Sequence, residues 1–523
     1  MNQQRAASSH ATSGLTRFGA RLGLIALLLS ISACRERGVP AVSDRGTPSP
    51  STSATLADQE LAYGRAPIPD AGITYRSDVV VVGGGAAMVR SVSGDSLTWS
   101  IDARAPHLDE LKPGKVMFLT GRAVGRVLNL ERRGDVVAVT LGPVDLTDII
   151  SDGTISIHAP INVSAITFQT YPDVPGAFEL TPTGVTSASN GAASSPYHLA
   201  SERRGGRSGR ASYALVALPP AEEGSGTLAE KRPLPPPSKG SSVEVTVGDY
   251  AVELSRTSTG TGSDLSAKLS YNKKGVVVGV EFETKLESPT VDMNLGFSGG
   301  ALEKKELRIN GLKEISLGLV SGSETGLSGN FKSRLEIPAE MTFPLPGGPI
   351  PLVGSIRFKF IVTTAFSAKN ATLRATGKLK LDGPIGFIGT KILLPTVTQT
   401  QSPAESLTGV SVGVNGVIVA AQIKEVIGLG IPAAMAGPFA AFTVSYGMTN
   451  GSSIGIVQCR QTSIDVIVAG GAGYTLAPGE SKVLELLKMK LPWAPKIDSE
   501  IASASTTVVH RVDYEPKVPV CRP

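Results

Sequence analysis

Residues 451–455 (GSSIG) match G-x-S-x-G, the arrangement in which many serine hydrolases place their nucleophile. That chemistry needs the serine on a sharp turn between a strand and a helix. Here residues 442–446 and 454–457 are strand-like, and Asn450-Gly451 is typical of a hairpin turn between two strands. The surroundings therefore predict a β-hairpin. We identify no catalytic residue in the sequence, which favours a non-enzymatic function.

The glycines at residues 83–85 follow four valines, as in the first turn of a dinucleotide-binding domain. That motif, G-x-G-x-x-G, must open a helix whose N-terminus receives the pyrophosphate. Met88 occupies the place of the third glycine, and residues 91–99 are polar and strand-like. A turn between two strands is the better interpretation, and no cofactor is predicted.

Histidines and acidic residues are not arranged as metal ligands. Asp145, Asp148 and Asp152 lack the alternating pattern of a calcium loop, so they are predicted to cap a helix and face solvent. The histidines are far apart and none has a partner at ligand spacing. They are His10, His107, His158, His198 and His510. No metal is predicted.

Cys34 follows a segment with the order of a secretion signal. Residues 22–29 are an apolar core, residues 31–33 are mostly small, and no acidic residue precedes Cys34. Three arginines lie before or at the edge of the apolar core: Arg5, Arg17 and Arg21. This order predicts a cleaved signal peptide at residues 1–33, which is too short to span a membrane in the mature chain.

Residues 31–34 (ISAC) resemble the lipobox of bacterial lipoproteins. The resemblance implies that Cys34 is lipidated and becomes the first residue of the mature chain, so the membrane is the partner at this end. Several acyl chains would make the anchor stable. Arg35 replaces the aspartate that can retain such proteins in the inner membrane, which favours the outer membrane. The alternative is an ordinary signal peptide with a chance cysteine.

Cys459 and Cys521 are the two cysteines outside the signal region. In an oxidising compartment an even pair is most simply one disulfide, which would tie the C-terminal tail to its domain. Two free thiols are the alternative.

The charge balance argues against nucleic acid as a partner. The formal net charge is +5, and three of these charges belong to the predicted signal. The mature chain is therefore nearly neutral, without the strongly basic character of nucleic-acid-binding domains.

Composition predicts two disordered stretches and two folded ones. Residues 34–74, rich in Ser, Thr, Pro and Ala, are predicted to be a tether, and residues 183–242, rich in Arg, Gly and Pro, a linker. Between them, residues 75–182 predict a small β-domain with one short helix at 144–150. An alternative function for the linker is a basic patch that contacts an anionic lipid or an envelope polymer. Its arginines are Arg203, Arg204, Arg207 and Arg210.

Residues 243–523 predict a large antiparallel β-domain, because apolar and polar side chains alternate along many segments. The strongest alternation is at residues 243–247, 265–271, 278–283, 291–298 and 373–381. Residues 480–490 are a helix candidate that also permits a strand. The predicted fold class is therefore all-β, mainly antiparallel, with two β-rich domains, disordered linkers and a minor helical part.

Residues 427–442 are nearly all apolar, but Pro432 and Pro438 argue against a helix. They predict a buried β-segment and loop. The functional alternative for this segment is the wall of an apolar ligand cavity.

Residues 111–114 (LKPG), 144–150 and 152–153 resemble a module of large uncharacterised bacterial secreted and surface proteins. In those proteins the module precedes a long Gly-rich β-region, and the proline-rich residues 344–351 look like a crossing in that region. The resemblance covers about residues 76–450. It implies a location and an architecture but no reaction, so no functional residue is transferred.

Three functions are compatible with these patterns. The favoured one is a lipid-anchored surface protein that binds or adheres without catalysis. The second is a periplasmic protein that handles lipid or polymer in an apolar cavity. The third is a hydrolase, which would need paired carboxylates; Glu281, Glu283 and Glu287 are more simply the solvated face of a strand.

Overall fold

The computed structural model describes most of the chain beyond residue 55. The described residues are 56–68, 72–171, 178–182, 233–259, 262–409, 415–453, 457–476 and 500–521, without residues 236, 274, 347, 349, 368 and 433. All of them belong to one compact unit, Ala54–Pro523. The predicted signal peptide, Cys34, the four linker arginines and the helix candidate at 480–490 lie outside the described residues.

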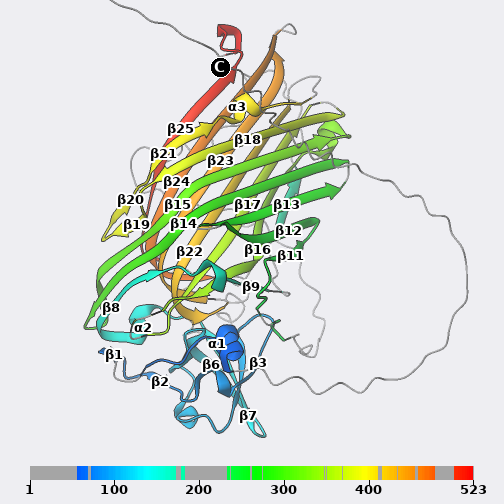
Figure 1. Ribbon diagram of the computed structural model, residues 1–523. Helices are drawn as coiled ribbons and strands as arrows, with labels where there is room; N and C mark the ends of the chain where they lie inside the picture. Colours follow the sequence, from blue (N-terminus) through cyan, green and yellow to red (C-terminus); the bar gives the residue numbers. More distant parts are fainter. Residues whose placement is uncertain are drawn as a thin grey trace, which may run out of the picture. The chain divides into compact units, whose positions relative to one another are not determined.

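The described chain is all-β, which confirms the predicted fold class (Figure 1). Its strands form three mainly antiparallel sheets of eleven, eight and six strands. The helical part is minor: α1 (Leu56–Tyr63), α2 (Leu146–Ile149) and α3 (Pro403–Ser406). The helix predicted at 144–150 is α2, and its start is capped where Asp148 Oδ2 accepts a hydrogen bond from the backbone N of Asp145 at 3.1 Å.

The eleven-stranded sheet is built from long hairpins whose side chains alternate between a buried and a solvated face. In β14, for example, Val280 and Phe282 are buried and Glu281 is half-exposed between them. The order along its main path is β11 (Ser242–Val247), β12 (Tyr250–Thr259), β13 (Gly262–Lys273), β14 (Val276–Ser298), β15 (Ala301–Ser323), β18 (Ala371–Asp382) and β21 (Thr396–Gln401). Also paired to this sheet are β1 (Ile73–Tyr75), β8 (Ile150–Pro160), β19 (Ile385–Ile388) and β20 (Lys391–Leu393).

The eight-stranded sheet contains the apolar residues 427–442, which lie at the end of β22 and in β23 as β-structure. Its order is β10 (Phe178–Pro182), β16 (Phe331–Pro344), β17 (Val353–Phe366), β22 (Asn415–Ile431), β23 (Ala434–Ser453), β24 (Val457–Leu476) and β25 (Glu500–Glu515), with β9 (Thr167–Thr170) beside β16. The two large sheets share one core, in which the ring of Phe282 on β14 lies 6.4 Å from the ring of Phe358 on β17. Their apolar faces therefore pack against each other.

The six-stranded sheet has a separate core around Trp99 and Ile101. Its order is β2 (Val79–Val81), β5 (Val116–Thr120), β6 (Ala123–Arg133), β7 (Val136–Gly142), β4 (Thr98–Asp102) and β3 (Val89–Val92). Residues 56–63 fall in the predicted tether but form α1, because Tyr63 packs its ring 6.0 Å from that of Trp99. The contact gives this short segment an apolar surface to cover.

The small sheet ends earlier than the boundary predicted at residue 182. Strand β8 pairs with β14, and β9 and β10 both pair with β16, so these three strands belong to the large sheets. Alternation identifies a strand and its buried face, but it does not specify which strand lies beside it. The local pattern was therefore insufficient to place these strands.

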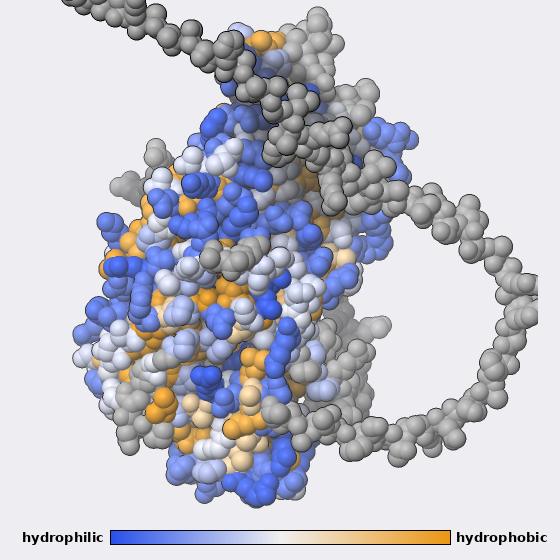
Figure 2. All heavy atoms as spheres, in the orientation of Figure 1, coloured by the Kyte–Doolittle hydropathy of each residue, from blue (hydrophilic) through white to orange (hydrophobic). Residues whose placement is uncertain are grey.

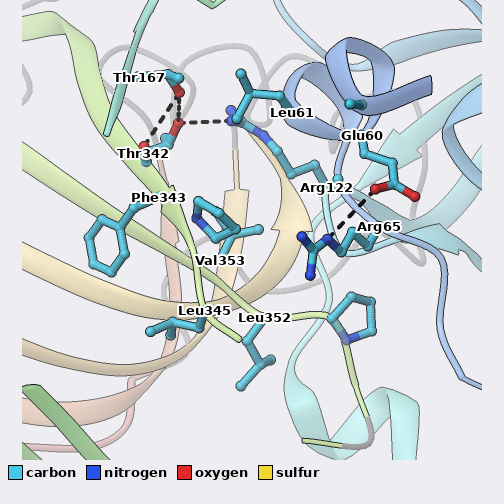
Figure 3. Close-up of a pocket in the computed structure, with 14 residues that line it drawn as sticks. Glu60, Leu61, Arg65, Arg122, Thr167, Thr342, Phe343, Leu345, Leu352 and Val353 are labelled. Atoms are coloured by element: carbon cyan, nitrogen blue, oxygen red, sulfur yellow. Dashed lines mark hydrogen bonds and ion pairs between the residues drawn. The ribbon is translucent and has the colours of Figure 1, made fainter. Parts of the chain in front are cut away.

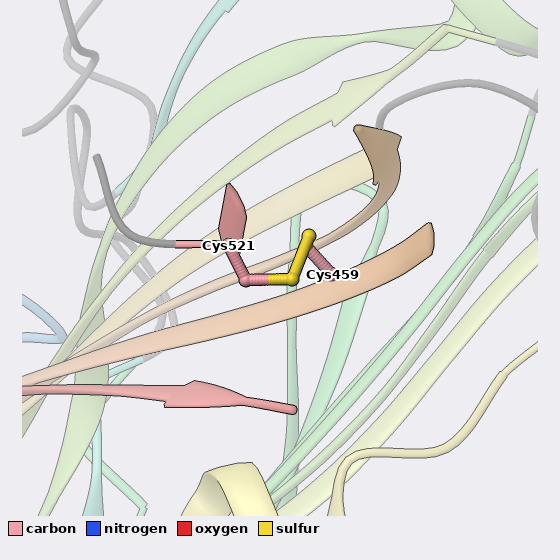
Figure 4. Close-up of a disulfide and its surroundings, with 2 residues drawn as sticks. All are labelled: Cys459 and Cys521. Carbon is pink, nitrogen blue, oxygen red and sulfur yellow. A yellow bond between two sulfur atoms is a disulfide. The ribbon is translucent and has the colours of Figure 1, made fainter. Parts of the chain in front are cut away.

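Cys459 and Cys521 form a disulfide, with their Cα atoms 5.3 Å apart, that joins β24 to the C-terminal tail (Figure 4). It closes a loop with a sequence separation of 62 residues. We expect the double variant Cys459→Ser/Cys521→Ser to lose about 2–4 kcal/mol of unfolding free energy, because the unfolded chain gains conformational freedom. Urea unfolding of the variant should match that of the reduced wild-type protein. Equal stability of the variant and the oxidised protein would contradict this role.

Candidate ligand-binding cavity

A small cavity of about 40 Å³ lies between the two large sheets. Apolar side chains form most of its wall. From the eleven-stranded sheet and its connections these include Ile161, Ile166, Leu265, Leu286, Ile309 and Leu312. From the facing sheet they are Ile356, Ile423, Ala440 and Phe442. This lining, rather than the volume, is typical of a site for a small apolar ligand.

The cavity forms where β14 changes its neighbour. Strand β13 ends opposite Glu287, and β8 ends opposite Thr290, so the sheet has a gap between these two positions. The pairing of β14 with β15 also shifts register here, and Ser288 has a φ of 43°. Such an irregularity bends a strand away from the sheet surface. Side chains beneath it therefore do not meet closely.

The opposite wall is set by the register of three neighbouring strands. Ile356 on β17, Glu425 on β22 and Ala440 on β23 stand side by side. The methyl group of Ala440 is small, which leaves space next to the carboxyl group of Glu425. Ala440 and Phe442 lie in the segment whose functional alternative was a cavity wall, and both line this cavity.

Glu425 is the only acidic residue among the described residues that line the cavity. Its Oε1 atom is buried and has no hydrogen-bonding partner in the described part of the chain. The neighbouring Lys424 points to the other face of β22, where its Nζ lies 4.0 Å from the ring centre of Phe439. Burial without a countercharge raises the pKa of Glu425 to about 8. The side chain is therefore mostly uncharged at neutral pH.

Sequence reasoning missed Glu425, although a signal was present. Every second residue of β22 faces the core, and the apolar members of this row are Val417, Val419, Ala421, Ile423 and Ile427. Glu425 is the single charged residue in that row. An acidic residue in an otherwise apolar period-two pattern marks a buried carboxyl group, which needs a structural or functional explanation.

The cavity has the chemistry of a binding site. A protonated carboxyl group donates one hydrogen bond and accepts others, while the apolar wall excludes charged groups. The described lining contains two further polar residues, Thr284 and Asn310. Neither these residues nor Glu425 forms a pair of a nucleophile and a base. The arrangement can therefore orient the polar end of an apolar molecule.

The predicted glycine turn is confirmed, whereas the turn predicted at Asn450-Gly451 is wrong in its position, because both residues lie within β23 opposite Arg460 and Cys459. The glycine run connects β2 to β3 through a short 3-10 turn, Gly85–Met88, and Gly84 and Gly85 have φ values of 85° and 56°. Glycine adopts this left-handed backbone without strain, whereas other residues are strained in it. The G-x-S-x-G motif lies where β23 pairs with β24 as an antiparallel hairpin, with Ser453 opposite Val457. The next described element after this serine is strand β24, whereas a nucleophile elbow requires a helix.

The remaining polar residues from the sequence lie on solvated faces. Glu281 pairs with Lys268 at 2.9 Å on the outer face of the eleven-stranded sheet. Figure 2 shows many hydrophilic side chains over the part of this view in which β14, β15 and β18 lie. His158 and His510 each contact one aspartate, Asp292 and Asp465. Among the described residues, no three His, Cys, Asp or Glu side chains are grouped so that they could hold a metal ion.

Two family models match the chain. Residues 231–503, more than half of the chain, match "Domain of unknown function (DUF8402)", and residues 59–152 match "Domain of unknown function (DUF8403)". The second match covers α1 and the six-stranded sheet, and the first covers most of the two large sheets. Neither a curated protein nor a solved structure matches the chain. In the described part of the chain, no helix has the length and apolar character needed to cross a membrane.

Proposed function

Because the chain belongs to the family of the domain of unknown function DUF8402, whose description states no activity, we propose its function from its own residues. The protein is a lipid-anchored protein of the bacterial cell envelope that binds single-chain lipids between its two large sheets. The observation that carries this proposal is the apolar cavity with the buried Oε1 of Glu425, which has no hydrogen-bonding partner among the described residues. The anchor is the lipobox-like cysteine, Cys34, and the chain between it and α1 is the tether.

The wall of the cavity selects an apolar chain. Removing apolar surface from water contributes about 25 cal/mol per Å², and the Leu, Ile, Ala and Phe side chains of the wall offer no competing polar contact. A packing defect lined by the same residues would gain nothing from an uncompensated carboxyl group, which costs about 1–3 kcal/mol when its hydrogen bonds are missing. A ligand whose polar end reaches Glu425 would remove that cost.

The protonation state of Glu425 selects the polar end of the ligand. The uncharged carboxyl group can hydrogen-bond to a hydroxyl, ester or amide group without burying a net charge. An anionic end would face a residue that is partly ionised at neutral pH, with no cation nearby. We therefore expect a fatty alcohol or a neutral monoacyl lipid to bind more tightly than a fatty sulfate of the same length.

Binding can be tested by displacement of the fluorescent apolar probe N-phenyl-1-naphthylamine. The protein is the mature chain with Cys34→Ser, so that no lipid is attached. We expect dodecanol to displace the probe, and Ala440→Phe, which places a ring beside Glu425, to weaken dodecanol binding at least about tenfold. A tenfold loss corresponds to about 1.4 kcal/mol. This is a modest fraction of the free energy that burial of the apolar chain would contribute.

The matched control is Ser445→Phe, which adds the same ring on the outer face of the same strand. It should leave binding unchanged. Equal binding to wild type and Ala440→Phe, with both chains folded by circular dichroism, would contradict binding in the cavity. Tighter binding of dodecylamine than of dodecanol would instead indicate that Glu425 acts as an anion toward a cationic ligand.

Surface binding or adhesion is the second candidate function. A groove on the outer face of the eleven-stranded sheet is lined by Gly279, Gly318, Val320 and Arg374, and a side chain added at either glycine would make only ordinary contacts. Glycine inside a strand often marks a close approach by another molecule. Protease treatment of intact cells separates the two candidates, because a surface partner needs the domain after residue 242 outside the cell.

A further inference from the structure

A second pocket lies where α1 and the 121–122 turn of the small sheet meet the ends of β16 and β17 (Figure 3). Its volume is about 140 Å³, and it shares no lining residue with the inter-sheet cavity. We call it the junction pocket. Its wall is largely apolar, with Leu61, Phe343, Leu345, Leu352 and Val353.

The buried polar end of the junction pocket is Arg122. Its side chain is 6% exposed, and its guanidinium donates to Thr342 Oγ1 and to Glu340 Oε1, both at 3.2 Å. Thr342 in turn shares a hydrogen bond of 3.0 Å with Thr167. Figure 3 shows Arg122 reaching toward Thr342, while the exposed Arg65 pairs with Glu60 elsewhere in the pocket. The chain thus places a buried cation beside the apolar side chains of this wall.

The backbone holds Arg122 in this position. The preceding Gly121 donates its N–H to the carbonyl of Arg65 and accepts from the N–H of Gly430, both at 3.0 Å. A Cβ atom at Gly121 would lie 2.1 Å from the carbonyl oxygen of Pro351. Only glycine permits this close approach. These contacts therefore hold the backbone at Arg122 in place.

The buried charges around Arg122 do not balance. Arg357 donates from Nε to Glu340 Oε2 at 3.0 Å, so two buried guanidiniums share one carboxylate. Burial alone would raise the pKa of Glu340, but Arg357 and Arg122 hold it below its usual value. Tyr171 does not supply a second negative charge, because burial and Glu340 raise its pKa well above the usual range. The described cluster therefore carries one uncompensated positive charge.

We infer that the junction pocket binds the acidic group of an amphiphile, a carboxylate or a phosphate monoester carried on an apolar chain. The anion would lie against Arg122 and balance the buried charge, and the chain would lie along Leu61, Phe343 and Leu352. A buried charge without a partner is costly, and a charge-assisted contact to a guanidinium is among the stronger hydrogen bonds. The junction pocket therefore prefers an anionic head group, whereas the inter-sheet cavity prefers an uncharged one. Binding at the junction pocket does not depend on binding in the inter-sheet cavity.

Titration calorimetry of the mature chain carrying Cys34→Ser and Ala440→Phe, in which the inter-sheet cavity is blocked to decanol, tests the inference with four probes. We expect sodium decanoate and decyl phosphate to bind at least tenfold more tightly than decanol and than inorganic phosphate. Decanol binding as tight as decanoate would show that the charge is not recognised. Inorganic phosphate binding as tight as decyl phosphate would show a site for a free anion and overturn the amphiphile.

Two variants locate the binding. Leu61→Trp fills the pocket without touching the charged cluster, and should weaken decanoate binding at least tenfold. Leu56→Trp, on the same helix at a position that is 59% exposed, is the matched control and should change nothing. Unchanged binding in Leu61→Trp would place decanoate elsewhere and overturn the inference.

A third variant tests the charge count itself. In Arg122→Met, Glu340 keeps its ion pair with Arg357 and its hydrogen bond from Ser355. One carboxylate then faces one guanidinium, so the cluster becomes neutral. Decanoate should then lose its advantage over decanol. A retained preference for decanoate would contradict the role of the uncompensated charge. Each titration is repeated without Ala440→Phe, and unchanged binding of decanoate and decyl phosphate there separates this site from the inter-sheet cavity.

Discussion

Replacing Glu340 with glutamine is expected to lower the free energy of unfolding by about 3–5 kcal/mol, the usual cost of breaking a buried ion pair. Glu340 is 1% exposed and is held by Arg122, Arg357 and the hydroxyl of Ser355, which donates at 2.5 Å. Glutamine keeps the shape of the side chain but not its charge. Two buried guanidiniums would then face each other without a counterion.

Urea unfolding measures this loss, and Glu336→Gln is the matched control. Glu336 lies on the same strand and pairs with Arg334 at 2.9 Å, but its side chain is 28% exposed. Solvent screens that pair, so its loss should cost no more than about 1 kcal/mol. Equal destabilisation by Glu340→Gln and Glu336→Gln would mean that the buried cluster stabilises the fold no more than the more exposed ion pair does.

Replacing Glu425 with glutamine is expected to remove a pH dependence of about 3–5 kcal/mol from the stability of the protein. The ordinary pKa of 4.5 applies in the unfolded chain, and about 8 applies in the folded one. Between these values the folded protein holds a proton that the unfolded chain has released. This contribution is therefore complete below pH 4.5 and is lost as the pH rises through 8. Each pKa unit corresponds to about 1.4 kcal/mol, and water in the cavity reduces the total.

The measurement is the unfolding free energy in urea at pH 5 and at pH 9, for wild type and for Glu425→Gln. Wild type should lose more stability than the variant over this range. Glu281→Gln is the control, since that side chain is half-exposed and paired with Lys268. A wild-type profile parallel to that of Glu425→Gln would contradict the buried, uncharged state of Glu425.

Local patterns in the sequence were sufficient for the strands and their faces. The alternation around Val280 and Phe282 correctly placed these side chains in the core, because a strand turns every second residue to the same side. The same reasoning recognised that residues 442–457 contain a hairpin, but it placed the turn too early, because Asn450 and Gly451 lie inside β23 opposite Arg460 and Cys459. It also recognised the short helix whose start is capped by the side chain of Asp148. These features depend on neighbours within a few residues, which the sequence displays directly.

Features that depend on distant partners were not predictable in this way. Glu340 meets Arg122 across 218 residues, and no local pattern connects them. The gap in the sheet that opens the cavity arises because β13 and β8 share β14 as their neighbour, which alternation does not encode. Glu425 was visible as the single acidic residue in an apolar row, but its isolation became clear only when the facing sheet was in place.

The most direct test of the proposed function is diffraction from crystals of the mature chain, with Cys34→Ser, grown with 12-bromododecanol. The bromine atom gives an anomalous signal that locates the end of the chain without ambiguity. We expect the bromine between the two large sheets, near Ile309 or Leu312, with the hydroxyl group within hydrogen-bonding distance of Glu425. Bromine on the outer surface, or an inter-sheet cavity that contains only water or side chains, would contradict lipid binding at this site.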